Sequence, residues 1–179
     1  MHASDIHGHV LEVADDMYTR RFGGERVTKS DVLHVADRGP KVTIIADLSR
    51  DENIPSNTFD CIILTQTLHL IYDVPAVLRN VHRILKPGGV LLVTLPGISR
   101  ISREDMNRWG DYWRFTSLSA RRLFEDAFRA SNVTLQTYGN VLTAASFLYG
   151  LAAQELRQDE LDFHDPNYEV TIAVRAVKT

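Results

Sequence analysis

The chain of 179 residues has a single cysteine, Cys61, so no disulfide can form within it. One thiol fits a reducing compartment. No stretch approaches the roughly 18 consecutive apolar residues that mark a membrane-spanning helix. Residues 1–9 lack the apolar core of a secretory signal peptide. These absences predict a cytoplasmic protein with no membrane span.

An excess of positive charge is also missing. The 20 Lys and Arg residues are outnumbered by 23 Asp and Glu, so the formal net charge is −3. Proteins that bind nucleic acid usually carry a strong basic excess, and we therefore expect no nucleic-acid partner. His2, His7 and His9 have no cysteine near them and no zinc spacing. We expect a solvated tail there and no metal site.

Apolar runs predict seven strands, several of them continuous enough to be buried on both faces. The predicted strands are residues 10–14, 27–33, 42–46, 59–64, 90–95, 133–138 and 169–177.

Helical patterns lie between these strands. Residues 74–85 repeat apolar side chains at helical spacing and leave one polar face. Asp15 and Asp16 could cap a short helix that ends near residue 24, and another helix is expected over 117–130. Residues 141–156 are apolar nearly all round. That helix is expected to be buried, to cap a substrate pocket, or to meet a partner subunit, as in a homodimer.

This alternation of strands and helices predicts one α/β domain over residues 1–179. The sheet is expected to have seven mainly parallel strands with helices on both faces. The last connection permits an antiparallel edge strand. In such sheets the ligand lies outside the carboxyl ends of the strands, so the residues just after each strand are the candidates for a site.

Acidic residues occupy several of those positions. Glu12 belongs to the first strand, and Asp31 follows it by 19 residues. In nucleotide-binding folds an acidic residue about 20 residues past the first strand turn binds ribose hydroxyls. Asp47 and Leu48 follow the third predicted strand, and Thr65 follows the fourth. A solvated surface carboxylate is the alternative interpretation of Asp31.

Segments within residues 8–95 resemble class I S-adenosylmethionine-dependent methyltransferases of the type 11-like group. Residues 10–13 (Val-Leu-Glu-Val) resemble the first motif, Asp47 the adenine-contacting position, and residues 59–64 the fourth strand. Residues 85–91 (Leu-Lys-Pro-Gly-Gly-Val-Leu) resemble the family's most recognisable turn. The resemblance implies a Rossmann-like fold and S-adenosylmethionine as the cofactor. With the strand-end positions, it implies cofactor contacts at Glu12, Ala14, Asp15, Asp16, Asp31, Asp47, Leu48 and Thr65.

The sequence departs from the family in the first loop. The usual Gly-x-Gly-x-Gly is replaced by Ala14, Asp16 and Tyr18. Glycine lets the backbone approach a ligand closely, whereas Tyr18 either points away from the methionine site or fills it. Asp15 or Asp16 could attract the sulfonium and ammonium groups, or could only cap a helix. A dinucleotide oxidoreductase is disfavoured, because its phosphate-binding glycines are absent.

Methyl transfer requires alignment of the acceptor and, for some oxygen acceptors, a base. His69, which follows the fourth strand, is the candidate catalytic residue, and a structural histidine is the alternative. Residues 64–67 (Leu-Thr-Gln-Thr) lack the family's Asn-Pro-Pro-Tyr pattern for amino acceptors, which favours oxygen or carbon as the acceptor atom.

Aromatic and polar residues cluster after the fifth strand. Residues 109–128 resemble a bacterial subgroup found near glycosyltransferase genes, and aromatic side chains with polar tips suit a sugar. The candidate substrate-binding residues are Trp109, Tyr112, Trp113 and Arg114; a packed loop is the alternative. Two functions follow: methyl transfer to a small-molecule or glycan-related acceptor, or a binding or assembly module that has lost the cofactor loop.

Overall fold

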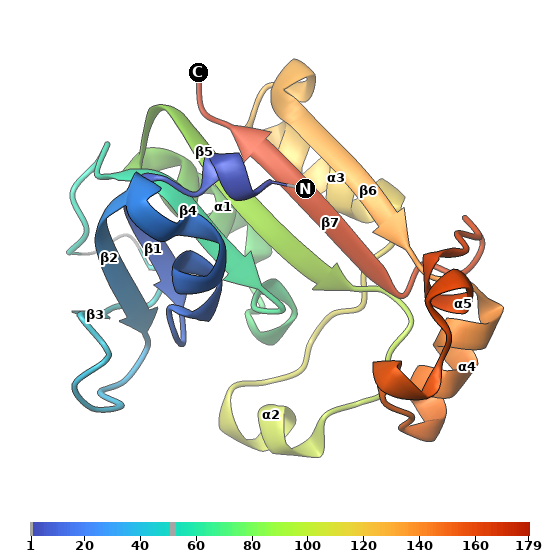
Figure 1. Ribbon diagram of the computed structural model, residues 1–179. Coiled ribbons are helices and arrows are strands. Elements are labelled where there is room, and N and C mark those ends of the chain that lie inside the picture. The colour runs from blue at the N-terminus through green and yellow to red at the C-terminus, as the bar shows by residue number, and fades with distance from the viewer. Residues whose placement is uncertain (1, 51–52) are drawn as a thin grey trace.

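A seven-strand sheet runs through the centre of the computed structural model, which describes residues 2–50 and 53–179 (Figure 1). The strand order is β3-β2-β1-β4-β5-β7-β6. The strands are β1 (Gly8–Val13), β2 (Val27–His34), β3 (Ile44–Ile45), β4 (Phe59–Thr65), β5 (Leu85–Pro96), β6 (Val133–Tyr138) and β7 (Thr171–Val177).

The predicted mainly parallel sheet is confirmed. β1 pairs in parallel with β2 and β4, and β4 pairs in parallel with β5. β7 runs antiparallel to both β5 and β6. The edge strand is β6, and β7 is the second strand from that edge. The carboxyl ends of β1, β2, β4 and β5 therefore meet at one edge of the sheet, where α2 lies (Figure 1).

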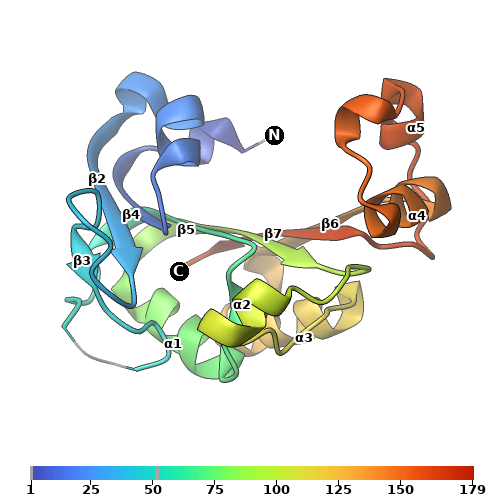
Figure 2. The same cartoon turned by 90° about the horizontal axis from the view of Figure 1, so that it is seen from below.

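Two α-helices cover one face of the sheet, and α2 lies beside them (Figure 2). The helices of the chain are α1 (Val74–Ile84), α2 (Arg103–Arg108), α3 (Ser117–Ala127), α4 (Val141–Tyr149) and α5 (Gln158–Asp162). α1 forms where the sequence predicts. Asp73 caps its N-terminus by accepting a hydrogen bond from the backbone N–H of Ala76. On its apolar face, the side chains of Val77, Leu78 and Val81 are fully buried. Each such side chain contributes about 1.5–3 kcal/mol of burial energy.

The opposite face is covered only at its two sides, by turns near the N-terminus and by α4 and α5 (Figure 2). Between β1 and β2 the chain forms a π-helical turn, Thr19–Gly23, and a 3-10 turn, Gly24–Arg26, in place of the expected helix. The predicted strand over 42–46 shrinks to the two residues of β3. None of the helices in the described ranges has the length and hydrophobicity needed to cross a bilayer.

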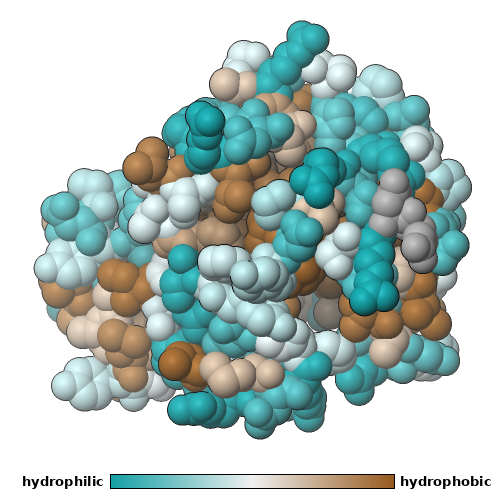
Figure 3. Space-filling view, turned by 180° about the vertical axis from the view of Figure 1, so that it is seen from behind, coloured by the Kyte–Doolittle hydropathy of each residue, from teal (hydrophilic) through white to brown (hydrophobic). Residues whose placement is uncertain are grey.

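The helix expected over 141–156 ends at Tyr149, because Gly150 takes a left-handed conformation with φ +82°. Of the three alternatives for this helix, burial does not hold, because its large apolar side chains are exposed. Its exposed apolar residues are Val141, Leu142, Phe147, Leu148 and Tyr149. Hydrophobic side chains gather over this region in Figure 3.

Candidate functional site

A cavity of about 540 Å³, here called the strand-end cavity, opens at the carboxyl ends of β1, β2 and β4. It brings together six of the predicted site residues: Ala14, Asp47, Leu48, Thr65, Trp109 and Tyr112. The other residues lining it are Val13, Leu33, His34, Val35, Ser49, Gln66, Thr67, Leu70, Ile71, Tyr72 and Arg108. The position of this cavity agrees with the expectation for an open α/β sheet.

The buried side chain of Glu12 accepts hydrogen bonds from the altered first loop. Its carboxylate accepts hydrogen bonds from the backbone N–H of Tyr18 (3.1 Å) and Thr19 (2.8 Å) and from the Thr19 hydroxyl (2.7 Å). Burial raises the pKa of Glu12 although these bonds favour its charged form. Glu12 thus shapes the loop and does not line the cavity. Ala14 has φ +74°, the left-handed conformation that usually selects glycine.

Asp15 and Asp16 do not face the strand-end cavity. Asp15 accepts from the backbone N–H of Met17 at 2.9 Å, and Asp16 pairs with Arg20. Both line a separate shallow depression beside Lys41. These contacts favour the alternative of local capping, and a cofactor contact of Asp15 or Asp16 stays a prediction.

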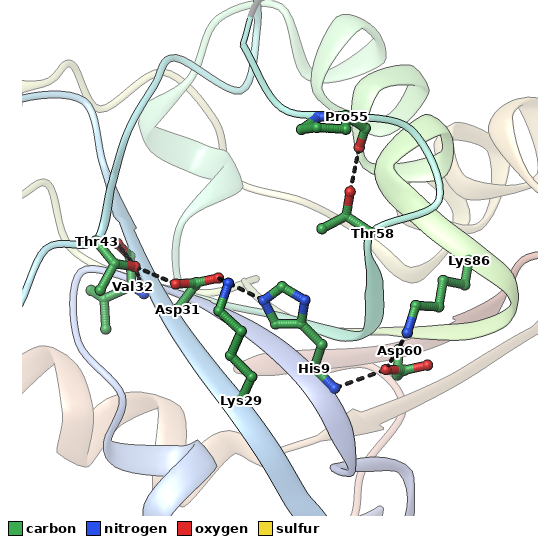
Figure 4. A network of polar contacts seen from close by, with 9 residues as sticks. All are labelled: His9, Lys29, Asp31, Val32, Thr43, Pro55, Thr58, Asp60 and Lys86. Atoms are coloured by element: carbon green, nitrogen blue, oxygen red, sulfur yellow. Dashed lines mark hydrogen bonds and ion pairs between the residues drawn. The ribbon is translucent and has the colours of Figure 1, made fainter.

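Asp31 is placed differently from the sequence expectation. It is the fifth residue of the eight-residue β2 and pairs in register with Leu11, so it stands mid-strand and outside the cavity. Its carboxylate binds His9 Nε2 (2.6 Å), Lys29 Nζ (3.0 Å) and Thr43 Oγ1 (2.8 Å), as Figure 4 shows. Burial would raise the pKa of Asp31, but these hydrogen bonds outweigh it and lower the pKa. This network favours a structural role for Asp31, and its ribose contact stays a prediction. His9 belongs to β1 rather than to a tail.

His34 occupies the end of β2 and lines the cavity in the place where Asp31 was expected. Its Nδ1 accepts from the backbone N–H of Ala36 at 3.1 Å, so Nε2 carries the proton of the neutral ring. The ring meets Trp109 edge-on at 5.2 Å, and the Arg38 guanidinium lies 5.1 Å from the Trp109 ring centre. Sequence reasoning missed His34; the turn at Gly39-Pro40 was the available signal for where β2 ends.

Asp47 and Leu48 follow β3 and line the cavity as expected. Asp47 Oδ1 accepts from the backbone N–H (2.9 Å) and hydroxyl (2.7 Å) of Ser49, which fixes the carboxylate at the cavity rim. Leu48 is buried, and its carbonyl accepts from the Asn80 side chain of α1 at 2.9 Å. Thr65 ends β4 at the floor of the same cavity.

The segment after β5 contributes Trp109 and Tyr112 to the cavity, whereas Trp113 and Arg114 hold the segment in place. The Arg114 guanidinium pairs with both oxygens of Asp111, at 2.5 and 2.9 Å. Trp113 Nε1 donates to the carbonyls of Ile71 and Tyr72, each at 3.2 Å. The charge of Arg114 is thus paired within the loop, and its contact with a substrate stays a prediction.

His69 lies in the short turn Leu68–Leu70 and does not line the cavity. Its carbonyl accepts from the backbone N–H of Tyr112 (2.9 Å) and of Trp113 (3.3 Å). Burial lowers the pKa of His69, although nearby Asp111 opposes this shift. Its buried Nδ1 has no hydrogen-bond partner among the described residues. This placement favours the structural alternative, and a catalytic role for His69 stays a prediction.

The strand-end cavity combines one carboxylate, two basic side chains, hydroxyls and aromatic rings. Asp47 offers an acceptor, His34 offers a donor, and Trp109 and Tyr112 offer flat surfaces for a planar ligand. In the described part of the chain, no three His, Cys, Asp or Glu side chains are grouped to hold a metal ion. The cavity suits a ligand with a flat ring and several polar groups.

A protein-family model for a methyltransferase domain matches residues 7–137. The match covers well over half of the chain and includes every strand of the parallel part of the sheet. The chain belongs to this methyltransferase domain family.

Curated relatives match this methyltransferase-domain chain over short segments. The "Arginine-hydroxylase NDUFAF5, mitochondrial" of Danio rerio is 37% identical over 78 residues, which is 41% of this chain and 24% of that protein. The "Ubiquinone/menaquinone biosynthesis C-methyltransferase UbiE" of Pasteurella multocida is 51% identical over 39 residues, 22% of this chain and 15% of that protein. The matched segments thus span a quarter or less of these relatives.

Solved structures share the fold across the whole methyltransferase domain. An S-adenosylmethionine-dependent methyltransferase from Mesorhizobium loti has a TM-score of 0.61 at 16% identity, with 97% of this chain and 93% of that chain covered. One from Archaeoglobus fulgidus has a TM-score of 0.63 at 12% identity, with 96% and 86% covered. These TM-scores establish the Rossmann-like methyltransferase fold. Because the sequence identities are low, the site is argued from its own residues.

Proposed function

We propose that this chain binds S-adenosylmethionine in the strand-end cavity and transfers its methyl group to a small-molecule or glycan-related acceptor, at an oxygen atom. The observation that carries the proposal is the set of residues that converge on the cavity. Ala14, Asp47 and Thr65 come from three strand ends that resemble the family's cofactor positions, and all three line one cavity.

The altered loop fits the cofactor in two respects. Ala14 holds the left-handed backbone for which the family uses glycine, and it adds only a methyl group. Tyr18, which could have filled the methionine site, lies outside the strand-end cavity. In this proposal Tyr18 does not occupy the methionine end of the cavity.

The lining assigns a role to each wall. Asp47 and Leu48 would hold the adenine, His34 would donate to the ribose from Nε2, and Ala14 and Thr65 would border the methionine end. S-adenosylmethionine, when bound, supplies a sulfonium methyl group: the acceptor oxygen gains the C–O bond, the S–C electron pair stays on sulfur, and the acceptor proton leaves to water. In this proposal the chain's contribution is alignment and exclusion of water.

Two features support an oxygen acceptor related to glycans. Residues 64–67 lack the pattern used for amino acceptors, and residues 109–128 resemble a bacterial subgroup found near glycosyltransferase genes. The Tyr72 ring meets Tyr112 at 5.5 Å and Trp113 at 5.6 Å. Aromatic rings arranged this way suit a flat ligand group.

The test is transfer of a tritium-labelled methyl group from S-adenosylmethionine to a panel of hydroxylated acceptors that includes 2-naphthol and methyl β-glucoside. We expect label in at least one acceptor, and at least tenfold less with Asp47→Ala. Cofactor binding without transfer to any acceptor would support the binding-module alternative and contradict the catalytic proposal.

A further inference from the structure

A second cavity of about 500 Å³ lies on the open face of the sheet, the face that α1 and α3 do not cover. We call it the sheet-face cavity. Its floor is formed by Ile63 of β4, Leu92 of β5 and Ala173 of β7, and Gln136 of β6 lines its far side. Hydroxyl-bearing residues of the strand ends lie among these apolar side chains.

The two cavities meet at the end of β4. Thr65 and Gln66 line both of them. Gln66 holds a left-handed backbone with φ +48°, which is unfavourable for a residue other than glycine. Its backbone N–H and its Nε2 approach Thr94 Oγ1 at 3.2 and 3.4 Å. A strained residue at the junction of two cavities is a feature typical of functional sites.

Tyr18 connects the altered loop to the sheet-face cavity. This residue stands where the family has its third glycine, and it lines the sheet-face cavity rather than the strand-end cavity. Its ring stacks on Phe22 at 6.1 Å, so the loop presents an aromatic wall. Tyr138 of β6 provides a second aromatic side chain across the floor. The replacement of glycine by tyrosine thus adds a wall to this cavity and leaves the neighbouring one open.

The charge of the lining narrows the class of ligand. Arg175 is the one Lys, Arg, Asp or Glu among the described lining residues, and Asp5 neutralises it through two bonds of 2.8 and 2.9 Å. A charged ligand would lose hydration without gaining a counter-ion. Thr94 and Gln136 offer hydrogen-bonding groups instead, between apolar and aromatic surfaces. These features favour an uncharged ligand with a flat apolar ring and a hydroxyl group.

We propose that the sheet-face cavity is the acceptor site and that it takes an uncharged, hydroxylated aromatic ring. The proposal rests on the proposed function, because an acceptor site needs a methyl donor in the strand-end cavity. The sharing of Thr65 and Gln66 places the two ligands on either side of one short segment. Tyr18, Thr94 and Gln136 are the residues that would select the acceptor.

The test is a titration with 2-naphthol, in which binding is detected by amide shifts in two-dimensional NMR spectra of the full chain. We expect 2-naphthol to shift the amides of Thr94, Gln136 and Ala173, and its charged counterpart 2-naphthoate to bind at least tenfold more weakly. Ala173→Phe should fill the cavity and weaken 2-naphthol at least tenfold. The matched control is Ala130→Phe, at an exposed position outside both cavities, which should have no effect. If Ala173→Phe fails to fold, Tyr18→Ala provides the test through loss of the aromatic wall.

S-adenosylhomocysteine is titrated into the same variants, so that the two proposals can fail separately. We expect its affinity to stay within twofold in Ala173→Phe. Normal S-adenosylhomocysteine binding with no 2-naphthol shifts at these amides would overturn the acceptor site and leave the proposed function intact. If 2-naphthol binds but S-adenosylhomocysteine does not, the chain has no methyl donor, and both the proposed function and the acceptor role of the sheet-face cavity are contradicted. A dimer that Ala173→Phe dissociates would make this face an interface between copies, which also contradicts the proposal.

Discussion

Glu12 and Thr19 are joined by two hydrogen bonds to a single carboxylate oxygen, from the Thr19 backbone N–H at 2.8 Å and from its hydroxyl at 2.7 Å. Tyr18 donates its backbone N–H to the other oxygen. The acidic residue of the first motif thus organises the loop that replaces the family's glycines. Tyr18 thus lines the sheet-face cavity and not the strand-end cavity.

Replacement of this carboxylate should weaken the loop. Glu12→Gln keeps the shape but turns one acceptor oxygen into a donor that faces other donors. We expect the free energy of unfolding to fall by about 1–3 kcal/mol, and S-adenosylhomocysteine affinity to fall with it. Urea unfolding measures the first effect and calorimetry the second. An unchanged unfolding curve would show that Glu12 does not organise the loop.

If His34 contacts the ribose and Asp31 has a structural role, variants of the two residues should behave differently. Asp31→Asn should lower stability by about 1–3 kcal/mol, because three donors lose a charged acceptor, and should leave S-adenosylhomocysteine affinity within twofold. His34→Ala should weaken that affinity about threefold to tenfold, equivalent to the loss of one hydrogen bond. Calorimetric titration of both variants decides the assignment; the reverse pattern would restore Asp31 as the ribose contact.

Asp47 and Asp37 form a matched pair of turn-capping carboxylates. Asp37 accepts from the backbone N–H of Gly39 at 2.9 Å, as Asp47 does from Ser49, but only Asp47 lines the strand-end cavity. We expect Asp47→Ala to weaken S-adenosylhomocysteine binding at least fivefold and Asp37→Ala to leave it unchanged. Equal losses in the two variants would attribute the effect to turn stability rather than to cofactor contact.

The ion pair of Asp111 and Arg114 predicts a dependence of stability on pH. Hydrogen bonds from Arg114 lower the pKa of Asp111 to about 2, whereas an unfolded aspartate titrates near about 3.9. Because solvent screens this pair, the lowered pKa contributes about 1–2 kcal/mol of stability above that unfolded value, and this contribution disappears as the pH falls from about 4 to 2.

Asp111→Asn should remove that part of the pH dependence, because an amide does not titrate. The measurement is urea unfolding of the native protein and the variant at several pH values between about 5 and 2. Glu104→Gln, which breaks the exposed pair with Arg108, is the control and should cost less than about 0.5 kcal/mol. Parallel acid-denaturation curves for the native protein and Asp111→Asn would contradict the assignment.

The elements that the sequence predicted well are those with strong apolar patterns. β1, β4, β5 and α1 have long apolar runs or a clear helical period, and they form the centre of the molecule. The bounds of β2 were predicted to within one residue, although its first half is polar and only its second half is buried. The ribose contact expected of Asp31 followed from its spacing of 19 residues after Glu12, whereas the structure places Asp31 within this strand.

Other differences arise from tertiary contacts that a single sequence does not display. The residues over 109–114 have two kinds of role. Trp109 and Tyr112 line the cavity. Trp113 donates to backbone carbonyls, and Arg114 pairs with Asp111. The residue types were consistent with either role, and only the hydrogen bonds separate them. The exposure of α4 likewise follows from its position beyond the sheet edge, not from its composition.

Calorimetric titration with S-adenosylhomocysteine tests the central claim, that the strand-end cavity still binds the cofactor despite the altered loop. The account predicts one site per chain with a dissociation constant of about 10 to 100 micromolar, equivalent to about 5.5 to 7 kcal/mol. The absence of heat at millimolar ligand, with protein shown to be folded, would contradict the account.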